Sequence, residues 1–258
     1  MSSGLRTQIG QLAQRSVRRT LRQPAQIVPA LVFPLFLLAV NSGGLKDVTN
    51  LPGFPTDSYL TFALAVPFMQ GALFSVMNTG TDLARDIETG FLNRLALTPL
   101  RGAALLSGLL AGTVLLGLVQ AVTYLSVGLI AGAELVTGVG GALTIVALSI
   151  SITVAFGSIG LFAALRTGSG EAVQSLFPVF FVFLFISAMS LPLELLQTQW
   201  FHDIASINPV TYLLETGRGF VAGDAPHIAG AFGIAIGLGL LFWVWAFRGL
   251  RNAEAAGA

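Results

Sequence analysis

The sequence DLARDIETGFLNRLALTPLR, from Asp82 to Arg101, is the one dense cluster of charge inside an otherwise apolar chain. Long apolar runs flank it on both sides. Hydrophobic residues make up 54% of the 258 residues, whereas charged residues make up only 10%. A soluble domain normally carries about 25% charged residues, so a soluble fold of this size could not bury so much apolar surface. The composition therefore predicts a protein surrounded mainly by lipid, with this stretch forming a cytosolic helix.

Six apolar runs are long enough to cross a membrane, since a bilayer core of about 30 Å requires roughly 20 apolar residues of helix. We expect one all-α membrane domain over residues 1–258. Its transmembrane spans are predicted at residues 25–43, 59–79, 102–131, 141–165, 173–190 and 228–247. Prolines inside the first, second and fifth spans are expected to kink those helices, because each proline removes a backbone donor.

Residues 1–23 form a basic amphipathic segment ahead of the first span. At 100° per residue, one face carries Arg15, Arg18, Arg19 and Arg22, and the opposite face carries Leu5, Ile9, Leu12, Ala13 and Ser16. Such a helix is expected to lie flat on the membrane with its arginines toward anionic headgroups.

The positions of the basic residues predict the orientation of the chain. With the N-terminus inside, 11 of the 13 lysines and arginines fall in cytosolic segments, and Lys46 and Arg218 fall outside. Because positive charge favours the cytosolic side, we expect both termini in the cytoplasm. The net charge of +1 gives no indication of nucleic-acid binding. Without cysteine, and with His202 and His227 isolated, no metal site is expected.

The charged stretch carries an apolar side as well. Asp82, Arg85, Asp86 and Glu88 are spaced to pair locally at i+3 and i+4. The apolar side consists of Phe91, Leu92, Leu95 and Leu97. A solvated connector does not need an apolar side, so the combination indicates a docking surface for another protein.

A second informative stretch, Leu191–Gly223, lies between the fifth and sixth spans on the outer side. It is too polar to cross the membrane but rich in aliphatic and aromatic residues, which fits helices that dip into the outer leaflet. Asn208-Pro209 is expected to divide it into two pieces. Glu215 and Arg218 are three residues apart and could pair on one helical face. The residues leave open whether this is a cap that seals the bundle or an exit gate.

Both stretches resemble the permeases of type-2 ABC exporters (ABC-2 type), in particular the daunorubicin-resistance-type drug and lipid exporters. In the first, the family's acidic-Glu-Gly-aliphatic-x-Arg-Leu…Thr-Pro-Leu pattern is read over residues 86–95 and 98–100. In the second, the matching positions are Pro192, Trp200, Ile204-Ala205, Asn208-Pro209-Val210-Thr211-Tyr212 and Arg218-Gly219. The sequence departs from the family pattern at Ser187–Ser190.

The resemblance implies a homodimer of permeases, or a pseudo-dimer with a paralogue, bound to two ABC ATPase subunits. The implied ATPase-coupling residues are Asp82, Arg85, Asp86, Glu88, Gly90, Arg94, Leu95, Arg15 and Arg19. The implied residues of the outer gate, built from short re-entrant helices, are Trp200, Asn208, Pro209, Tyr212, Glu215 and Arg218. Spans 1, 2 and 5 would line the transport path.

The chain lacks the G-x-x-x-x-G-K-[ST] sequence that cradles ATP phosphates, and its single lysine, Lys46, is predicted in an outer loop. It is therefore expected to be no enzyme and to hold no cofactor, with ATP and magnesium bound by the partner ATPase.

The resemblance implies outward movement of an amphiphilic drug, lipid or glycolipid across the bacterial plasma membrane, as in multidrug efflux and antibiotic resistance. The residues themselves do not exclude import. Alternatives are a membrane scaffold or assembly protein without transport, a polysaccharide-exporting permease, and an intramembrane enzyme using His202 and Asp203.

Overall fold

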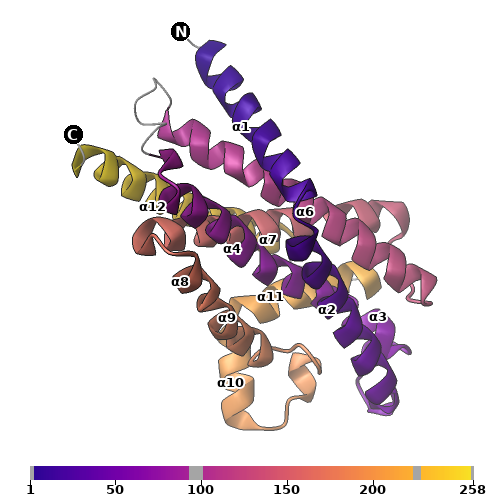
Figure 1. The fold of residues 1–258 in the computed structure, drawn as a ribbon. Coiled ribbons are helices and arrows are strands. Elements are labelled where there is room, and N and C mark those ends of the chain that lie inside the picture. The colour runs from indigo at the N-terminus through magenta and orange to yellow at the C-terminus, as the bar shows by residue number, and fades with distance from the viewer. Residues whose placement is uncertain (1–2, 93–100, 223–227, 257–258) are drawn as a thin grey trace.

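The computed structural model describes residues 3–92, 101–222 and 228–256, and within these residues all regular structure is helical (Figure 1). Five described helices are long and apolar enough to cross a membrane. They are α2 (Pro24–Gly44), α3 (Tyr59–Ala63) continued by α4 (Ala65–Glu88), α6 (Gly102–Ile130), α7 (Gly138–Thr167) and the Ile228–Arg251 part of α12 (Ile228–Ala256). Five of the six predicted spans thus correspond to long apolar helices.

The predicted fifth span, residues 173–190, is shorter than expected and divided. It consists of α8 (Gly170–Gln174) and α9 (Leu176–Phe185), so the apolar helix ends at Phe185 rather than at Ser190. At about 1.5 Å per residue, a helix from Gly170 to Phe185 covers roughly 24 Å, less than a hydrocarbon core of about 30 Å. A sixth membrane span therefore stays a prediction.

Two of the helix breaks follow from proline chemistry. Pro67 has no N–H to donate to the carbonyl of Ala63, four residues earlier. The α3–α4 break falls directly after Ala63, at Leu64. The α8–α9 break falls in the same way at Ser175, directly after Gln174, the residue four positions before Pro178. In α2, by contrast, Pro29 and Pro34 lie inside one continuous helix. The predicted kinks therefore occur as breaks in two of the three proline-containing segments.

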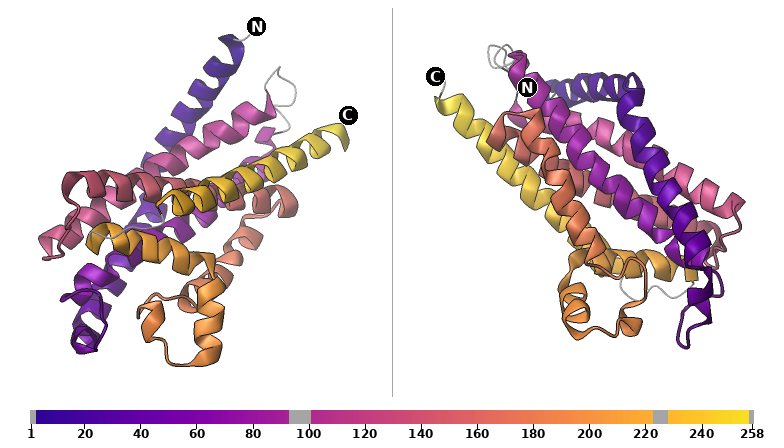
Figure 2. Two further views of the ribbon diagram at one scale, coloured as in Figure 1. Left: turned by 180° about the vertical axis from the view of Figure 1, so that it is seen from behind. Right: turned by 60° about the horizontal axis from the view of Figure 1, so that its bottom comes forward.

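The remaining elements lie at the two ends of the bundle (Figure 2). α1 (Ser3–Leu21) crosses the end at which α4 ends and α6 begins, which we call the α1 end. The opposite end holds α10 (Gln199–Ile207), α11 (Pro209–Ala222) and the short turns η1 (Lys46–Asn50) and η2 (Leu193–Leu195). α11 is tied to the α6–α7 connection there, because Val136 N donates to Val221 O at 3.0 Å.

The α4 helix lies at the centre of the bundle and contacts α2, α6, α7, α8, α9 and α11. Its closest approach is to α7, where Gly80 and Gly160 face each other. A Cβ on Gly80 would lie 2.8 Å from Gly160 O, and a Cβ on Gly160 would overlap Val76 O. Small residues let membrane helices pack backbone against backbone. The backbones of α4 and α7 are therefore in close contact at these two glycines.

Replacing Gly160 by alanine is expected to lower the free energy of unfolding by about 1–3 kcal/mol, the usual cost of overpacking a tight interior. The obstructing atom is a backbone carbonyl, which cannot rotate away as a side chain could. The measurement is the thermal unfolding of the purified protein in detergent. Gly140→Ala is the matched control, because no atom lies within 4 Å of a Cβ at Gly140. Equal stability of the two variants would contradict the close α4–α7 contact.

Candidate functional site

The N-terminal helix α1 is packed against α6 through small residues. A Cβ on Gly108 would collide with Leu12, and a Cβ on Gly112 would lie 2.5 Å from Ser16 Oγ. The Ser16 hydroxyl donates to Leu109 O at 2.9 Å and accepts from Gly112 N at 3.2 Å. The predicted apolar face of the amphipathic helix, with Leu12 and Ser16 on it, therefore meets protein rather than lipid.

Four charged side chains join α1 to the end of α4, and we call this network the clamp: Arg15, Arg19, Asp82 and Asp86. Arg15 donates both terminal nitrogens to the Asp86 carboxylate, each at 2.9 Å. Arg19 lies 3.1 Å from Asp86 Oδ1 and 3.0 Å from Asp82 Oδ1. The Asp86 side chain is only 5% exposed, so two arginines enclose a buried carboxylate. Such bidentate, charge-assisted pairs fix geometry as well as charge.

The clamp corrects two predictions. Arg15 and Arg19 do not point toward lipid headgroups with the rest of the basic face, because both bind α4; Arg18 and Arg22 are the exposed members of that face. Asp82 and Asp86 form ion pairs with α1 instead of the local pairs that their i+3 and i+4 spacing indicated. Asp86 binds two guanidinium groups of α1, whereas its neighbour Arg85 on α4 is exposed.

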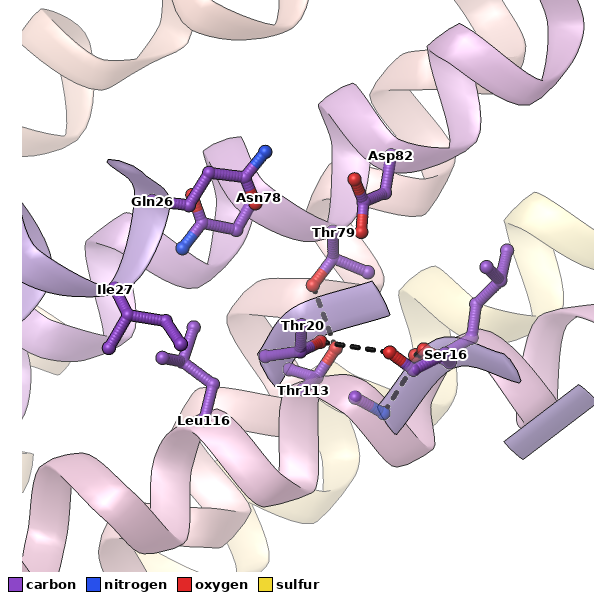
Figure 3. A pocket seen from close by; sticks show the side chains of 11 residues that line it. Ser16, Thr20, Gln26, Ile27, Asn78, Thr79, Asp82, Thr113 and Leu116 are labelled. Carbon is purple, nitrogen blue, oxygen red and sulfur yellow. Dashed lines mark hydrogen bonds between the residues drawn. The ribbon is translucent and has the colours of Figure 1, made fainter. Parts of the chain in front are cut away.

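A small polar pocket lies beside the clamp, where α1, α2, α4 and α6 meet (Figure 3). Asp82, Asn78 and Thr79 reach it from α4, and Thr113 reaches it from α6. The Thr79 and Thr113 hydroxyls are hydrogen-bonded at 2.7 Å. Its volume of about 20 Å³ is close to the space that one water molecule needs. The joint between α1 and the bundle therefore combines hydrogen bonds and ion pairs with the apolar packing of Leu12.

The other predicted coupling residues continue α4 away from the clamp. Asp82–Glu88 is the last part of α4 rather than a separate helix. Glu88 Oε1 accepts from Gly170 N at 3.1 Å, which ties α4 to α8, and Arg85 is exposed. Gly90 follows the helix with φ of +67°, the left-handed conformation typical of glycine at a helix end. Arg94 and Leu95 lie outside the described residues.

At the opposite end, Asn208 joins α9 to α11. Its Nδ2 donates to Phe183 O at 2.7 Å and to Ile186 O at 2.9 Å, which are carbonyls at the end of α9. Its Oδ1 accepts from Val210 N at 2.9 Å and so caps the start of α11. Pro209 occupies the first position of α11, where its missing N–H costs nothing. The predicted break at Asn208-Pro209 is confirmed.

Replacing Asn208 by alanine is expected to lower the free energy of unfolding by about 2–3 kcal/mol, because two part-buried carbonyls and one buried N–H lose their partner. Thermal unfolding in detergent measures the loss. Asn50→Ala, at an exposed position of η1, is the control and is expected to change little. If both variants unfold at the wild-type temperature, the α9–α11 junction does not depend on the Asn208 side chain.

Arg218 of α11 is the second residue at this end that joins separate elements, and it is only 5% exposed. Its Nη1 donates to Glu215 Oε1 at 2.7 Å, which confirms the predicted pair. Its Nη2 donates to Met189 O at 2.7 Å, and its Nε donates to Phe62 O at 3.3 Å. The guanidinium also lies 3.7 Å from the centre of the Phe62 ring. Burial raises the pKa of the Glu215 carboxyl above its ordinary value, and the Arg218 charge opposes part of that rise.

These contacts border a cavity of about 460 Å³ between η2, α10, α11 and the start of α3. Glu215, Arg218 and Tyr212 line it, together with Thr211, whose hydroxyl accepts from Ala188 N at 3.1 Å. The sixth predicted outer residue, Trp200, lies on α10, is 62% exposed and contacts Phe201. The structure thus brings five of the six predicted residues together in α11 and its N-terminal cap, and places Trp200 on the neighbouring helix.

Sequence reasoning missed Phe62, Met189 and Ala188, which supply backbone atoms or a ring to these junctions. Backbone partners carry no side-chain signal in a sequence. Phe62 could have been noticed as the aromatic residue at the start of a span, but nothing in its spacing connects it with Arg218.

Taken together, the fold and these sites define a multi-pass helical membrane protein with an ion-paired N-terminal helix at one end and a pair of short helices at the other. A family model described as ABC-2 type transporter matches residues 7–221, and the chain belongs to this family. Members of this family form the membrane component of a transporter and normally work with ATPase subunits. The protein is therefore a membrane-spanning permease subunit, as the sequence motifs predicted.

Two proteins are similar to this chain over most of its length. The ycf38 protein of Pyropia yezoensis, named as a candidate transport permease, is 29% identical over 221 residues, covering 84% of this chain and 75% of that protein. The ycf38 protein of Porphyra purpurea is 29% identical over 212 residues, covering 81% of this chain and 72% of that protein. Both are consistent with the family assignment.

Proposed function

We propose that the chain is the permease of an ATP-driven exporter that moves an amphiphilic substrate outward across the bacterial plasma membrane. The observation that carries the proposal is the clamp, which joins the surface helix α1 to the central helix α4. A helix lying across one end of a bundle can receive a push from a soluble partner. Its ion pairs with the central helix then turn that push into a movement of the membrane core.

In this mechanism the α1 end is cytoplasmic, as are both termini, and two ABC ATPase subunits bind there and hold ATP and magnesium. Closure of the ATPase pair presses on the exposed face of α1 and on the end of α4. The clamp makes α1 and α4 move together, and the glycine contact between α4 and α7 passes the movement inward. The hydrogen bond from Gly170 N to Glu88 of α4 passes the same movement to α8.

The transport path is proposed at the face formed by α2, α4 and α9, which correspond to the predicted spans 1, 2 and 5. Aromatic rings join these three helices. Phe33 of α2 contacts Phe74 of α4 at 6.2 Å and Phe181 of α9 at 5.8 Å, and Phe74 contacts Phe177 at 5.1 Å between ring centres. On the same helices, Phe36 of α2 and Phe183 of α9 are 60% and 53% exposed. A second permease, identical or paralogous, would cover this face and enclose an apolar path.

The cavity beside Arg218 is proposed as the exit, with α10 and α11 as its gate. An apolar, aromatic path of this kind suits a drug, lipid or glycolipid better than a hydrophilic sugar chain, which favours the amphiphile exporter over a polysaccharide exporter. The alternative from another functional class is a membrane scaffold without transport. The clamp and the cavity favour the exporter, because a scaffold would need neither.

The test is to co-purify the chain with a candidate ABC ATPase and to measure ATP hydrolysis in lipid nanodiscs, with and without amphiphilic drugs. We expect a stable complex whose hydrolysis rate changes several-fold with at least one amphiphile. A complex that hydrolyses ATP without responding to any amphiphile would contradict the substrate class. Failure to associate with any P-loop ATPase would contradict the exporter and leave the scaffold.

A further inference from the structure

A groove of about 500 Å³ lies between α6, α7 and α12. α7 forms its floor, and α6 and α12, which both pack along α7, form its walls. Leu110, Val154, Ile236, Leu240 and Trp243 line it and belong to three of the helices that can cross a membrane. The volume lies within the range of about 300–1,000 Å³ typical of ligand pockets. The groove therefore opens into the hydrocarbon region.

Two of the three serines that line the groove use their hydroxyls within α7. The hydroxyls of Ser151 and Ser158 donate to Ala147 O at 2.8 Å and to Val154 O at 2.9 Å within their own helix. Ile236 and Leu240 are 52% and 59% exposed, so the wall on α12 is uncovered apolar surface. The lining is mainly apolar and suits a hydrocarbon chain.

Basic residues mark the end of the groove that lies at the α1 end. Arg101 lies six residues before Ser107, Arg166 eight residues after Ser158 and Arg248 five residues after Trp243, which is roughly 7–12 Å along the helices. All three side chains are exposed, as is Arg251, and none of the four forms an ion pair within the described part of the chain. Glu171 follows Arg166 by five residues, and no ion pair joins the two in the described part of the chain.

We propose that this groove binds an anionic phospholipid, with an acyl chain along Val154 and Ile236 and the headgroup among Arg101, Arg166 and Arg248. Trp243 lies toward this end of the groove and stacks on Phe247, as expected of an aromatic residue near headgroups. Clustered arginines at the end of membrane helices attract anionic lipids. A second copy of the chain fits less well, because a two-fold interface here would place like charges of the two rims against each other.

The test is native mass spectrometry of the purified full chain with dioleoylphosphatidylglycerol and dioleoylphosphatidylcholine at equal concentrations. We expect preferential retention of phosphatidylglycerol. Replacing Arg101, Arg166 and Arg248 together by glutamine should reduce that preference about a hundredfold, at roughly fivefold for each arginine. Arg18→Gln, an exposed arginine on α1, is the charge control and should retain the preference.

A second variant tests the groove itself. Ile236→Trp fills it and should weaken both lipids roughly tenfold, the cost of uncovering about two methylene groups. Leu241→Trp is the matched control, because Leu241 is 42% exposed on the same helix but does not line the groove. Equal retention of the two lipids by the wild-type chain, identical behaviour of Ile236→Trp and Leu241→Trp, or a cross-link between two copies across the groove would each overturn the proposal. Because these measurements need no ATPase, the outcome is separate from that of the exporter test.

Discussion

Replacing Asp86 by asparagine is expected to release α1 from α4 and to abolish coupling between ATP hydrolysis and transport. The amide keeps the shape of the carboxylate but removes its charge, so Arg19 keeps only its ion pair with Asp82 and Arg15 loses the carboxylate that it binds. We expect the free energy of unfolding to fall by about 2–3 kcal/mol, less than for a fully buried pair because the Arg15 side chain is 38% exposed. Hydrogen exchange of residues 3–21 should accelerate while that of α7 stays slow.

Two variants control this result. Arg18→Gln removes an exposed arginine from the same helix and should leave exchange unchanged. The double variant Arg15→Gln/Asp86→Asn should lose less than the sum of the single variants, with a coupling energy of about 1–2 kcal/mol. Additive losses, or normal exchange of α1 in Asp86→Asn, would show that the clamp does not hold α1.

Replacing Arg218 by alanine is expected to open the α10–α11 end, with a loss of about 3 kcal/mol in the free energy of unfolding. Two buried carbonyls, those of Phe62 and Met189, lose their donor, at about 1–3 kcal/mol for each unsatisfied group. Glu215 adds less, because its side chain is 39% exposed and can hydrate. Arg218→Lys should recover little, since an ammonium cannot reproduce the planar fork that meets three partners.

Thermal unfolding and hydrogen exchange of residues 209–219 measure the effect of the Arg218 variants. Lys46→Ala removes an exposed basic residue at the same end and serves as the control. A wild-type melting temperature for Arg218→Ala would contradict the role of Arg218 as the junction between α11, α3 and the segment after α9.

Much of the fold could be predicted from the sequence, because a long apolar run in lipid forms a helix that satisfies its own backbone hydrogen bonds. The boundaries of α2, α6 and α7 agree with the predicted spans to within three residues. The α8–α9 segment was overestimated, since its apolar composition continues to Met189 whereas the helix ends at Phe185. Composition shows which residues are apolar, but it does not show at which of them a helix ends.

The sites were predicted unevenly, for a physical reason. Glu215 and Arg218 are neighbours on one helix, so their spacing was sufficient to predict the pair. Arg15 and Asp86 are 71 residues apart, and no local pattern links them. Their types and positions indicated two charged surfaces on the same side of the membrane. That these surfaces bind each other depends on the packing of α1 against Gly108 and Gly112 of α6, which only the structure shows.

Site-directed cross-linking to the ATPase tests the central claim most directly, because the native chain has no cysteine to interfere. Single cysteines at Gln11 and Arg18, exposed on α1, and at Asn50 and Ile207, exposed at the other end, would each carry a photo-reactive maleimide in the purified complex. The account predicts that the α1 positions capture the ATPase and that Asn50 and Ile207 do not. Capture from the α10–α11 end, or no capture from α1 in an intact complex, would contradict the proposal that α1 and α4 receive the force of ATP hydrolysis.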